Sequence, residues 1–213
     1  MKNHITIIGA GVGGLTTALT LQQKDFEFSV YESAAEIKPV GAGIILANNA
    51  MQVMQKLGLQ EKLEKAGNRI SAMKITDPHL KPLSVVDLTS FEQKYQVSNL
   101  AIHRGDLQNI LAAEIGLENI NFSKRLAKVE KDTSYNLTFA DNSTLQTAII
   151  IGADGIKSVV RNQLFAENRI RNANQICWRG VGKIDLPEKY QHELNEAWGK
   201  GKRFGFEIGR AHV

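Results

Sequence analysis

The length, composition and charge of this chain indicate a globular protein. It has 213 residues, of which 43% are hydrophobic and 23% charged, and this length suits one large domain or two small ones. No stretch approaches the roughly 20 consecutive apolar residues of a membrane helix, and the amino-terminal segment lacks a signal-peptide cleavage site. We therefore expect a cytoplasmic protein without a membrane partner.

The distribution of charged, cysteine and metal-binding residues argues against nucleic-acid binding, an internal disulfide and a metal site. The 26 basic and 22 acidic residues are scattered, and no basic segment contains interleaved aromatic residues, so we expect no nucleic-acid partner. The single Cys177 excludes an internal disulfide, and its residue type favours a buried position. No cluster has metal-ligand spacing and no nucleophilic triad can be argued, so we predict neither a metal site nor a catalytic side chain. The sequence does not indicate an oligomeric state.

The amino-terminal segment has the pattern of a strand, a helix and a second strand. A β-branched run predicts a strand over residues 5–8, apolar spacing predicts a helix over 13–24, and another apolar run predicts a strand over 28–31. A glycine-broken segment over 40–45 precedes a helical pattern over 48–66, with a break at Gly58.

The middle of the chain changes to shorter elements. Short strands are predicted between residues 69 and 88, followed by a polar loop to Ser98, which together look like an inserted sheet. A strand over 100–103 and a helix over 106–115 come next.

The following segment is rich in strands. Strands are predicted near Ile120 and, as a hairpin, over 126–131 and 135–140. The apolar run over 147–151 suits a central parallel strand that is buried on both faces and returns to the first sheet. The fold class is therefore α/β.

The first turn contains a dinucleotide-binding fingerprint. Gly9, Gly11 and Gly14 lie between the first strand and the first helix, where glycines permit a tight turn, close approach of a pyrophosphate and close helix packing. Glu32 ends the second strand about 20 residues further on, where a carboxylate can accept hydrogen bonds from a ribose hydroxyl. This βαβ unit predicts binding of the ADP part of a dinucleotide, but it does not separate FAD from NAD.

Three further segments carry residues that suit a cofactor site. They are GAGIIL around Gly43, HRGDL around Arg104, and GADG with Asp154 and Gly155. Each has a simpler interpretation: a plain turn at Gly43, a surface arginine beside a helix-capping Asp106, or Asp154 as a helix N-cap. The residues alone leave these alternatives open.

Taken with the fingerprint, these segments resemble the class A flavoprotein monooxygenases, the aromatic hydroxylase family. The resemblance covers nearly the whole chain to Phe206 and implies a glutathione-reductase-like Rossmann FAD-binding domain with an inserted or second β-sheet substrate domain, which is incomplete here. It implies that the segment CWRG, residues 177–180, begins the substrate-domain sheet. The cofactor-binding residues it implies are Gly9, Gly11, Gly13, Gly14, Glu32, Ser33, Gly43, Arg104, Asp154 and Gly155.

The same resemblance implies an activity. NADH or NADPH would reduce FAD, and O2 would form a flavin C4a-hydroperoxide that passes one oxygen atom to an aromatic or other small organic substrate. Two alternatives stay open: a flavin-dependent reductase of the prenyl-reductase type, and a non-catalytic or inactive nucleotide-binding fragment.

The carboxyl end departs from the family pattern. Family members continue through a second Gly-Asp motif that this chain lacks, so we expect a truncated chain that retains FAD weakly. The last seven residues can be written in codons that match a common sequencing adapter, and we expect them to be non-native. The predicted segments are residues 1–68 and 100–168 for the FAD-binding domain, 69–99 for inserted strands, 169–206 for the start of the substrate-domain sheet, and 207–213 for the tail.

Overall fold

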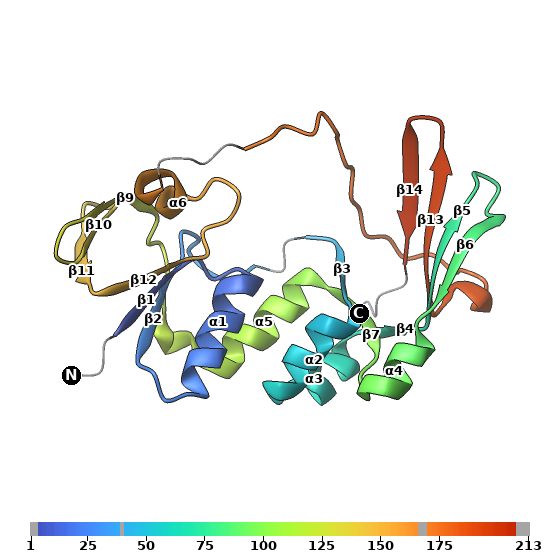
Figure 1. The fold of residues 1–213 in the computed structure, drawn as a ribbon, viewed down its shortest axis with the longest axis horizontal. Coiled ribbons are helices and arrows are strands. Elements are labelled where there is room, and N and C mark those ends of the chain that lie inside the picture. The colour runs from blue at the N-terminus through green and yellow to red at the C-terminus, as the bar shows by residue number, and fades with distance from the viewer. Residues whose placement is uncertain (1–3, 39–40, 166–169, 208–213) are drawn as a thin grey trace. The chain divides into compact units, whose positions relative to one another are not determined.

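The computed structural model describes residues 4–38, 41–165 and 170–207. The chain forms two compact units (Figure 1). The first unit comprises Met1–Pro39 and Gln108–Cys177, and the second comprises Val40–Leu107 and Trp178–Val213. The predicted non-native tail lies outside the described residues except for Glu207. The predicted segment boundaries stay predictions.

A parallel sheet forms the centre of the first unit, with strand order β12-β1-β2-β8. Its strands are β1 (Ile5–Ile8), β2 (Phe28–Tyr31), β8 (Ile120–Asn121) and β12 (Ile149–Gly152). All four residues of β1 are buried, because the strand pairs on both sides and its β-branched side chains pack on both faces. The predicted strands over 5–8 and 28–31 are confirmed.

Helix α1 (Val12–Gln22) connects β1 to β2 and completes the predicted βαβ unit. It buries Leu15, Ala18 and Leu19, three of the four apolar residues whose spacing predicted the helix, and the fourth, Leu21, is half-buried. The carboxyl-terminal part of α5 (Arg104–Ile115) also belongs to the first unit and buries Leu111 and Ile115. The short helix η1 (Leu117–Asn119) then leads into β8.

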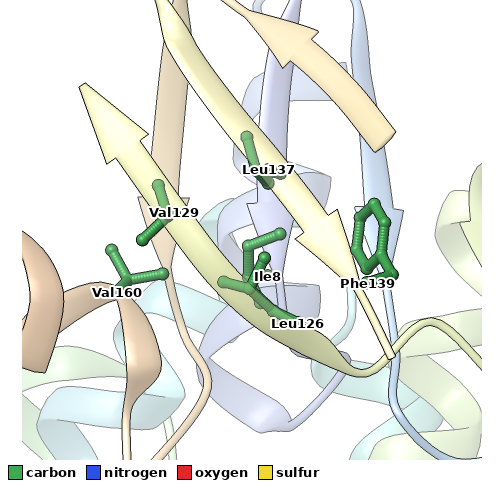
Figure 2. Close-up of a cluster of buried hydrophobic side chains, with 6 residues drawn as sticks. All are labelled: Ile8, Leu126, Val129, Leu137, Phe139 and Val160. Carbon is green, nitrogen blue, oxygen red and sulfur yellow. The ribbon is translucent and has the colours of Figure 1, made fainter. Parts of the chain in front are cut away.

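A second, antiparallel sheet of the first unit has the order β11-β10-β9. It consists of β9 (Leu126–Lys131), β10 (Tyr135–Phe139) and β11 (Thr144–Thr147), and the predicted hairpin of β9 and β10 is confirmed. Figure 2 shows the hydrophobic cluster that joins this sheet to β1 and to helix α6 (Val159–Leu164). Its buried members are Ile8, Leu126, Val129, Leu137, Phe139 and Val160.

Tyr31 packs at the edge of this cluster. Its ring stacks on Phe139 with the ring centroids 5.2 Å apart. Burial raises the pKa of the Tyr31 hydroxyl above its ordinary value, against a smaller opposing effect of the Lys124 ammonium. The hydroxyl is therefore neutral at physiological pH, as a side chain at the edge of an apolar core should be.

The prediction for residues 147–151 was partly wrong. Thr147 ends β11, and β12 begins only at Ile149. In the part of the chain that the structure describes, β12 pairs with β1 alone, and Ile149, Ile150 and Ile151 are only half-buried. An apolar run indicates a strand, but it does not reveal whether the strand lies at the centre or at the edge of the sheet.

The second unit contains an antiparallel sheet of order β3-β7-β4 with two helices beside it. The strands are β3 (Gly43–Leu46), β4 (Asn68–Ile70) and β7 (Asn99–His103), and the helices are α2 (Asn48–Lys56) and α3 (Gln60–Ala66). The predicted break at Gly58 is confirmed: this residue has φ +76°, a left-handed conformation that glycine adopts at low cost.

The other sheet of the second unit has the order β14-β13-β5-β6. Its strands are β5 (Ala72–Thr76), β6 (Pro82–Asp87), β13 (Glu193–Gly199) and β14 (Lys202–Phe206), and the short helix η2 (Glu188–Tyr190) precedes β13. The predicted polar loop to Ser98 was wrong, because it contains helix α4 (Thr89–Tyr95). The Asp87 carboxylate accepts hydrogen bonds from the backbone N–H and hydroxyl of Thr89 and so supports the start of this helix.

The segment before β13 corrects two further expectations. Residues 170–187 contain no helix or strand, so the segment CWRG does not begin a strand, and the sheet resumes only at Glu193. Cys177 is exposed rather than buried, and Trp178 is 92% exposed. These side chains lie in a segment without regular structure, where their hydrophobic character does not determine burial.

Candidate functional site

The turn between β1 and α1 requires a glycine at its first position. Gly9 has φ +104°, and a Cβ atom there would lie 2.5 Å from the carbonyl oxygen of Ala153. The Gly9 N–H donates to the carbonyl of Tyr31 at 2.8 Å, and the Ala153 N–H donates to the carbonyl of Ile8 at 2.8 Å. The turn is therefore fixed by backbone contacts to both neighbouring strands of its sheet.

The other glycines of the fingerprint fall into two kinds. A Cβ at Gly14 would lie 1.9 Å from the carbonyl oxygen of Gly9, so only glycine allows α1 to approach the turn this closely. A Cβ at Gly11 or Gly13 would meet nothing within 4 Å. These two positions leave open space beside the backbone, as a ligand that approaches the turn would need.

The amino terminus of α1 can receive an anion. Gly11 is the N-cap residue, and among the described residues no side chain caps the helix and no acidic residue lies in its first turn. The first N–H groups of a helix have no partner within the helix, and they carry a partial positive charge. The open space at Gly11 and Gly13 and these N–H groups together fit a phosphate group.

The Glu32 carboxylate is held beside the glycine turn. One oxygen accepts a hydrogen bond from the Ala10 N–H at 2.7 Å. The other accepts from the Ser33 hydroxyl at 3.0 Å and the Ala34 N–H at 2.8 Å. A carboxylate offers about four acceptor positions, and these bonds use three of them. The described residues therefore leave one acceptor position open for a ligand hydroxyl.

The Asp154 carboxylate has several partners in its own segment. One oxygen accepts from the Ser158 hydroxyl at 2.6 Å, and the other accepts from the backbone N–H groups of Val159 at 2.7 Å and Val160 at 3.2 Å. The N-cap residue of α6 is Ser158, whose hydroxyl oxygen accepts from the Arg161 N–H. Asp154 thus supports the start of α6 from outside the helix.

The loop around Asp154 also contacts the glycine turn. Ala153, the preceding residue, supplies the carbonyl that lies against Gly9. Gly155 has φ +79°, a left-handed conformation that lets the chain turn between Asp154 and α6. Within the first unit, the predicted residues Gly9, Gly14 and Asp154 therefore belong to one compact arrangement.

Two arginines line a cavity within the second unit. The cavity has a volume of about 340 Å³ and is lined by Gly41, Ala42, Gly43, Ile44, Arg104, Arg179 and Gly180. The Arg104 N–H donates to the carbonyl of Ala42 at 3.2 Å, and helix α5 begins at Arg104, so Asp106 lies inside the first turn instead of capping it. Gly41 has φ +136°, where a side chain would be strained.

The charge around this cavity is mixed. In the described part of the chain, neither Arg104 nor Arg179 forms an ion pair with a carboxylate. However, the Glu207 carboxylate lies against Gly43, with one oxygen 2.8 Å from the position that a Cβ would take. The two guanidinium groups favour an anionic ligand, and Glu207 opposes one.

A second cavity of the second unit is mostly apolar. It has a volume of about 370 Å³ and lies on the sheet that contains β13 and β14. Its lining residues are Pro78, Leu80, Ala197, Gly199, Lys202, Arg203, Phe204 and Phe206. Two phenyl rings with cationic side chains beside them suit a flat organic molecule.

The described residues form neither a metal site nor a membrane-spanning helix. No group of three or more His, Cys, Asp or Glu side chains is arranged to hold a metal ion. Equally, none of the described helices combines the length and apolar character needed to cross a membrane.

Comparison with known families identifies the family of this chain and its cofactor. A family model described as "FAD binding domain" matches residues 2–195. The chain belongs to the FAD binding domain family. This membership confirms FAD as the cofactor and confirms the resemblance to FAD-dependent hydroxylases.

Relatives of this family member include two enzymes. The aurachin C monooxygenase/isomerase of Stigmatella aurantiaca is 34% identical over 212 residues, which cover 96% of this chain and 54% of that protein. The FAD-dependent urate hydroxylase of Mycolicibacterium vanbaalenii is 34% identical over 204 residues, covering 93% of this chain and 52% of the hydroxylase. The chain spans about half the length of these relatives.

A solved structure confirms the fold. Klebsiella pneumoniae HpxO complexed with FAD and uric acid matches with a TM-score of 0.78 at 21% identity, over 98% of this chain and 54% of that one. The predicted α/β fold with a Rossmann-type FAD-binding domain is therefore confirmed.

Two residues at these sites were not among the sequence predictions. Arg179 lines the same cavity as Arg104, although 75 positions separate them in the sequence. Gln108 donates from its side-chain amide to the carbonyl of Ala10 at 2.7 Å. The sequence carried a weak signal for each, because Arg179 belongs to the segment CWRG and Gln108 directly follows HRGDL.

Proposed function

We propose that this chain is the FAD-binding part of an NAD(P)H-using monooxygenase that inserts one atom of O2 into an aromatic or other small organic substrate. The names of its relatives, a monooxygenase/isomerase and a urate hydroxylase, support this proposal. The observation that carries it is the glycine turn, where an uncapped helix start lies next to the Glu32 carboxylate. A cytoplasmic location stays a prediction.

The first unit would hold the ADP part of the cofactor. The N–H groups at the start of α1 would bind phosphate, and the open space at Gly11 and Gly13 would let it approach. Glu32 would accept a hydrogen bond from a ribose hydroxyl, and Ser33, which donates to Glu32, would help to fix that carboxylate. Gly9 and Gly14 act indirectly, because they allow the turn and the helix to pack.

Further predicted residues would contribute in other ways. Asp154 and Gly155 would shape the loop that lies against the glycine turn. In the second unit, Gly43 and Arg104 stay predicted cofactor-binding residues, and the cavity that they line with Arg179 suits an anionic group. The apolar cavity lined by Phe204 and Phe206 would hold the ring of the organic substrate.

The division of chemical roles follows from these residues. Bound FAD supplies the redox chemistry with NAD(P)H and O2. The protein groups bind and orient the cofactor and shield the substrate from water. No protein nucleophile is needed for such a reaction, and the absence of a catalytic side chain stays a prediction.

The proposal is tested in two steps. First, the purified chain is titrated with FAD, and we expect saturable binding at one FAD per chain. Second, the protein is mixed with FAD, NADH or NADPH, and a panel of small aromatic compounds under air. Oxygen consumption stimulated by one compound supports a monooxygenase, whereas NAD(P)H-dependent saturation of an isoprenoid double bond without oxygen uptake indicates a reductase.

A further inference from the structure

The N–H and the carbonyl of Ala10 each form a hydrogen bond with a side chain of the first unit. The Ala10 N–H donates to the Glu32 carboxylate at 2.7 Å. The Ala10 carbonyl accepts a hydrogen bond from the side-chain amide of Gln108, also at 2.7 Å. Gln108 is half-buried and comes from α5, almost a hundred residues away in the sequence. A distant helix therefore contacts the glycine turn at one specific carbonyl.

This hydrogen bond constrains the next N–H group as well. A peptide bond is planar and trans, so its C=O and N–H bonds point in opposite directions. Fixing the carbonyl of Ala10 therefore fixes the direction of the Gly11 N–H, which points away from Gln108. Gly11 is the N-cap of α1, with φ −70° and ψ 176°, and the space that its Cβ would occupy is open. The Gly11 N–H thus belongs to the anion-binding start of the helix.

We propose that Gln108 is a positioning residue for the cofactor's diphosphate. It orients the Ala10–Gly11 peptide so that the Gly11 N–H is presented to a phosphate oxygen. This inference rests on the proposed binding of FAD by the first unit. The neutral amide suits the role, because it donates a hydrogen bond to the carbonyl without placing a negative charge beside a phosphate.

The direct test removes the donor and measures FAD affinity by titration of the purified chain. In Gln108→Leu, the lost hydrogen bond should weaken FAD binding by about threefold to tenfold. Gln108→Glu keeps the side-chain length but places a carboxylate against the Ala10 carbonyl and near the diphosphate, so its loss should be larger. Gln108→Met, which resembles glutamine in volume, serves if the leucine variant does not fold.

A matched control is available within the same unit. The Gln163 side chain accepts a hydrogen bond from the Val129 N–H at 2.7 Å and donates to the carbonyl of Ala127 at 3.4 Å, within the packing of α6 against β9. Gln163→Leu therefore removes an amide-to-backbone contact that does not involve the glycine turn. It should lower the melting temperature of the ligand-free chain but leave the FAD dissociation constant unchanged.

Phosphorus-31 NMR of bound FAD separates positioning from stability. Compared with FAD bound to the wild-type chain, the diphosphate resonances should shift in Gln108→Leu and keep their chemical shifts in Gln163→Leu. If the wild-type chain binds FAD and the Gln108 variants bind it with the same affinity and the same phosphorus spectrum, the inference is wrong while the proposed function stands. If the folded wild-type chain does not bind FAD at all, the proposed function fails and the inference fails with it.

Discussion

The glycine turn of the first unit and the arginine cavity of the second unit both suit an anion, but by opposite means. The turn relies on the absence of side chains, because Gly9 and Gly14 are packed against backbone and Gly11 leaves open space. The cavity relies on the presence of long charged side chains, Arg104 and Arg179.

This difference determines how each region should respond to change. Backbone N–H groups at the start of a packed helix are fixed in place before a ligand binds, so little ordering entropy is lost. The arginine side chains must lose rotamer freedom on binding, and salt screens their charge. Substitutions in the turn should therefore affect folding and binding together, whereas substitutions in the cavity should affect binding alone.

The largest effect is expected from Gly14→Ala. The new Cβ would lie 1.9 Å from the carbonyl oxygen of Gly9, so helix α1 must move away from the turn. We expect the free energy of unfolding in urea to fall by roughly 3 kcal/mol or more. Gly13→Ala is the matched control, because its Cβ meets nothing within 4 Å, and helix propensity should make it more stable by up to about 1 kcal/mol. Equal effects of both changes would contradict the packing role of Gly14.

The arginine cavity should give the next largest effect. Replacing Arg104 or Arg179 by alanine should weaken FAD binding by about tenfold to a hundredfold, the range for a lost hydrogen bond to a charged group. The melting temperature of the ligand-free chain should stay the same. Glu207→Gln removes the carboxylate near Gly43 and should tighten binding. A titration in which both alanine variants match the wild type would show that the cavity takes no anionic part of the cofactor.

Glu32→Gln should have a moderate effect. It should weaken FAD binding, as the cavity substitutions do, and it should also lower stability, as the turn substitutions do. The amide keeps one acceptor oxygen, but its NH2 group cannot accept from the Ala10 N–H or from a ribose hydroxyl. We expect FAD binding to weaken by roughly tenfold and the urea-unfolding free energy to fall by about 1 kcal/mol. Weaker binding of a 2′,3′-dideoxyribose analogue to the wild type, with no further loss in the variant, would locate the effect at the ribose. Additive losses would contradict that role.

The smallest effect is expected at Asp141, which belongs to neither region. Hydrogen bonds from Lys124 and Ser143 hold the pKa of this carboxyl well below the ordinary Asp value. A lowered folded-state pKa stabilises the fold above the unfolded pKa of about 3.9, and the contribution is lost as pH falls further. Asp141→Asn should thus be slightly less stable than wild type in urea at pH 7, and the difference should shrink toward pH 2. If the stability difference between wild type and Asp141→Asn grew as the pH fell, the predicted direction of the pH dependence would be wrong.

Local patterns made the amino-terminal βαβ segment easier to predict than the rest of the chain. The strand at 5–8, the glycines and Glu32 lie within one short βαβ segment, so residue type and spacing were sufficient to predict them. Helix α4 was missed because its support, Asp87 with Thr89, resembles an ordinary polar loop. The exposure of Cys177 and the edge position of β12 depend on which elements pack nearby, and residue type does not carry that information.

The candidate sites show the same limit. The glycine fingerprint predicted the turn, but the contact of Gln108 with Ala10 joins residues from two distant segments. The cavity of the second unit likewise combines residues 41–44 with Arg104 and Arg179. Such combinations follow from the fold and not from spacing along the chain.

The central claim, that the glycine turn binds the ADP part of FAD, is tested most directly by an equilibrium titration of the folded chain with FAD in the presence and absence of ADP. We predict weak but saturable binding of one FAD per chain, with ADP as a competitor. Failure of the folded chain to bind FAD saturably, or binding that excess ADP leaves unchanged, would contradict the claim.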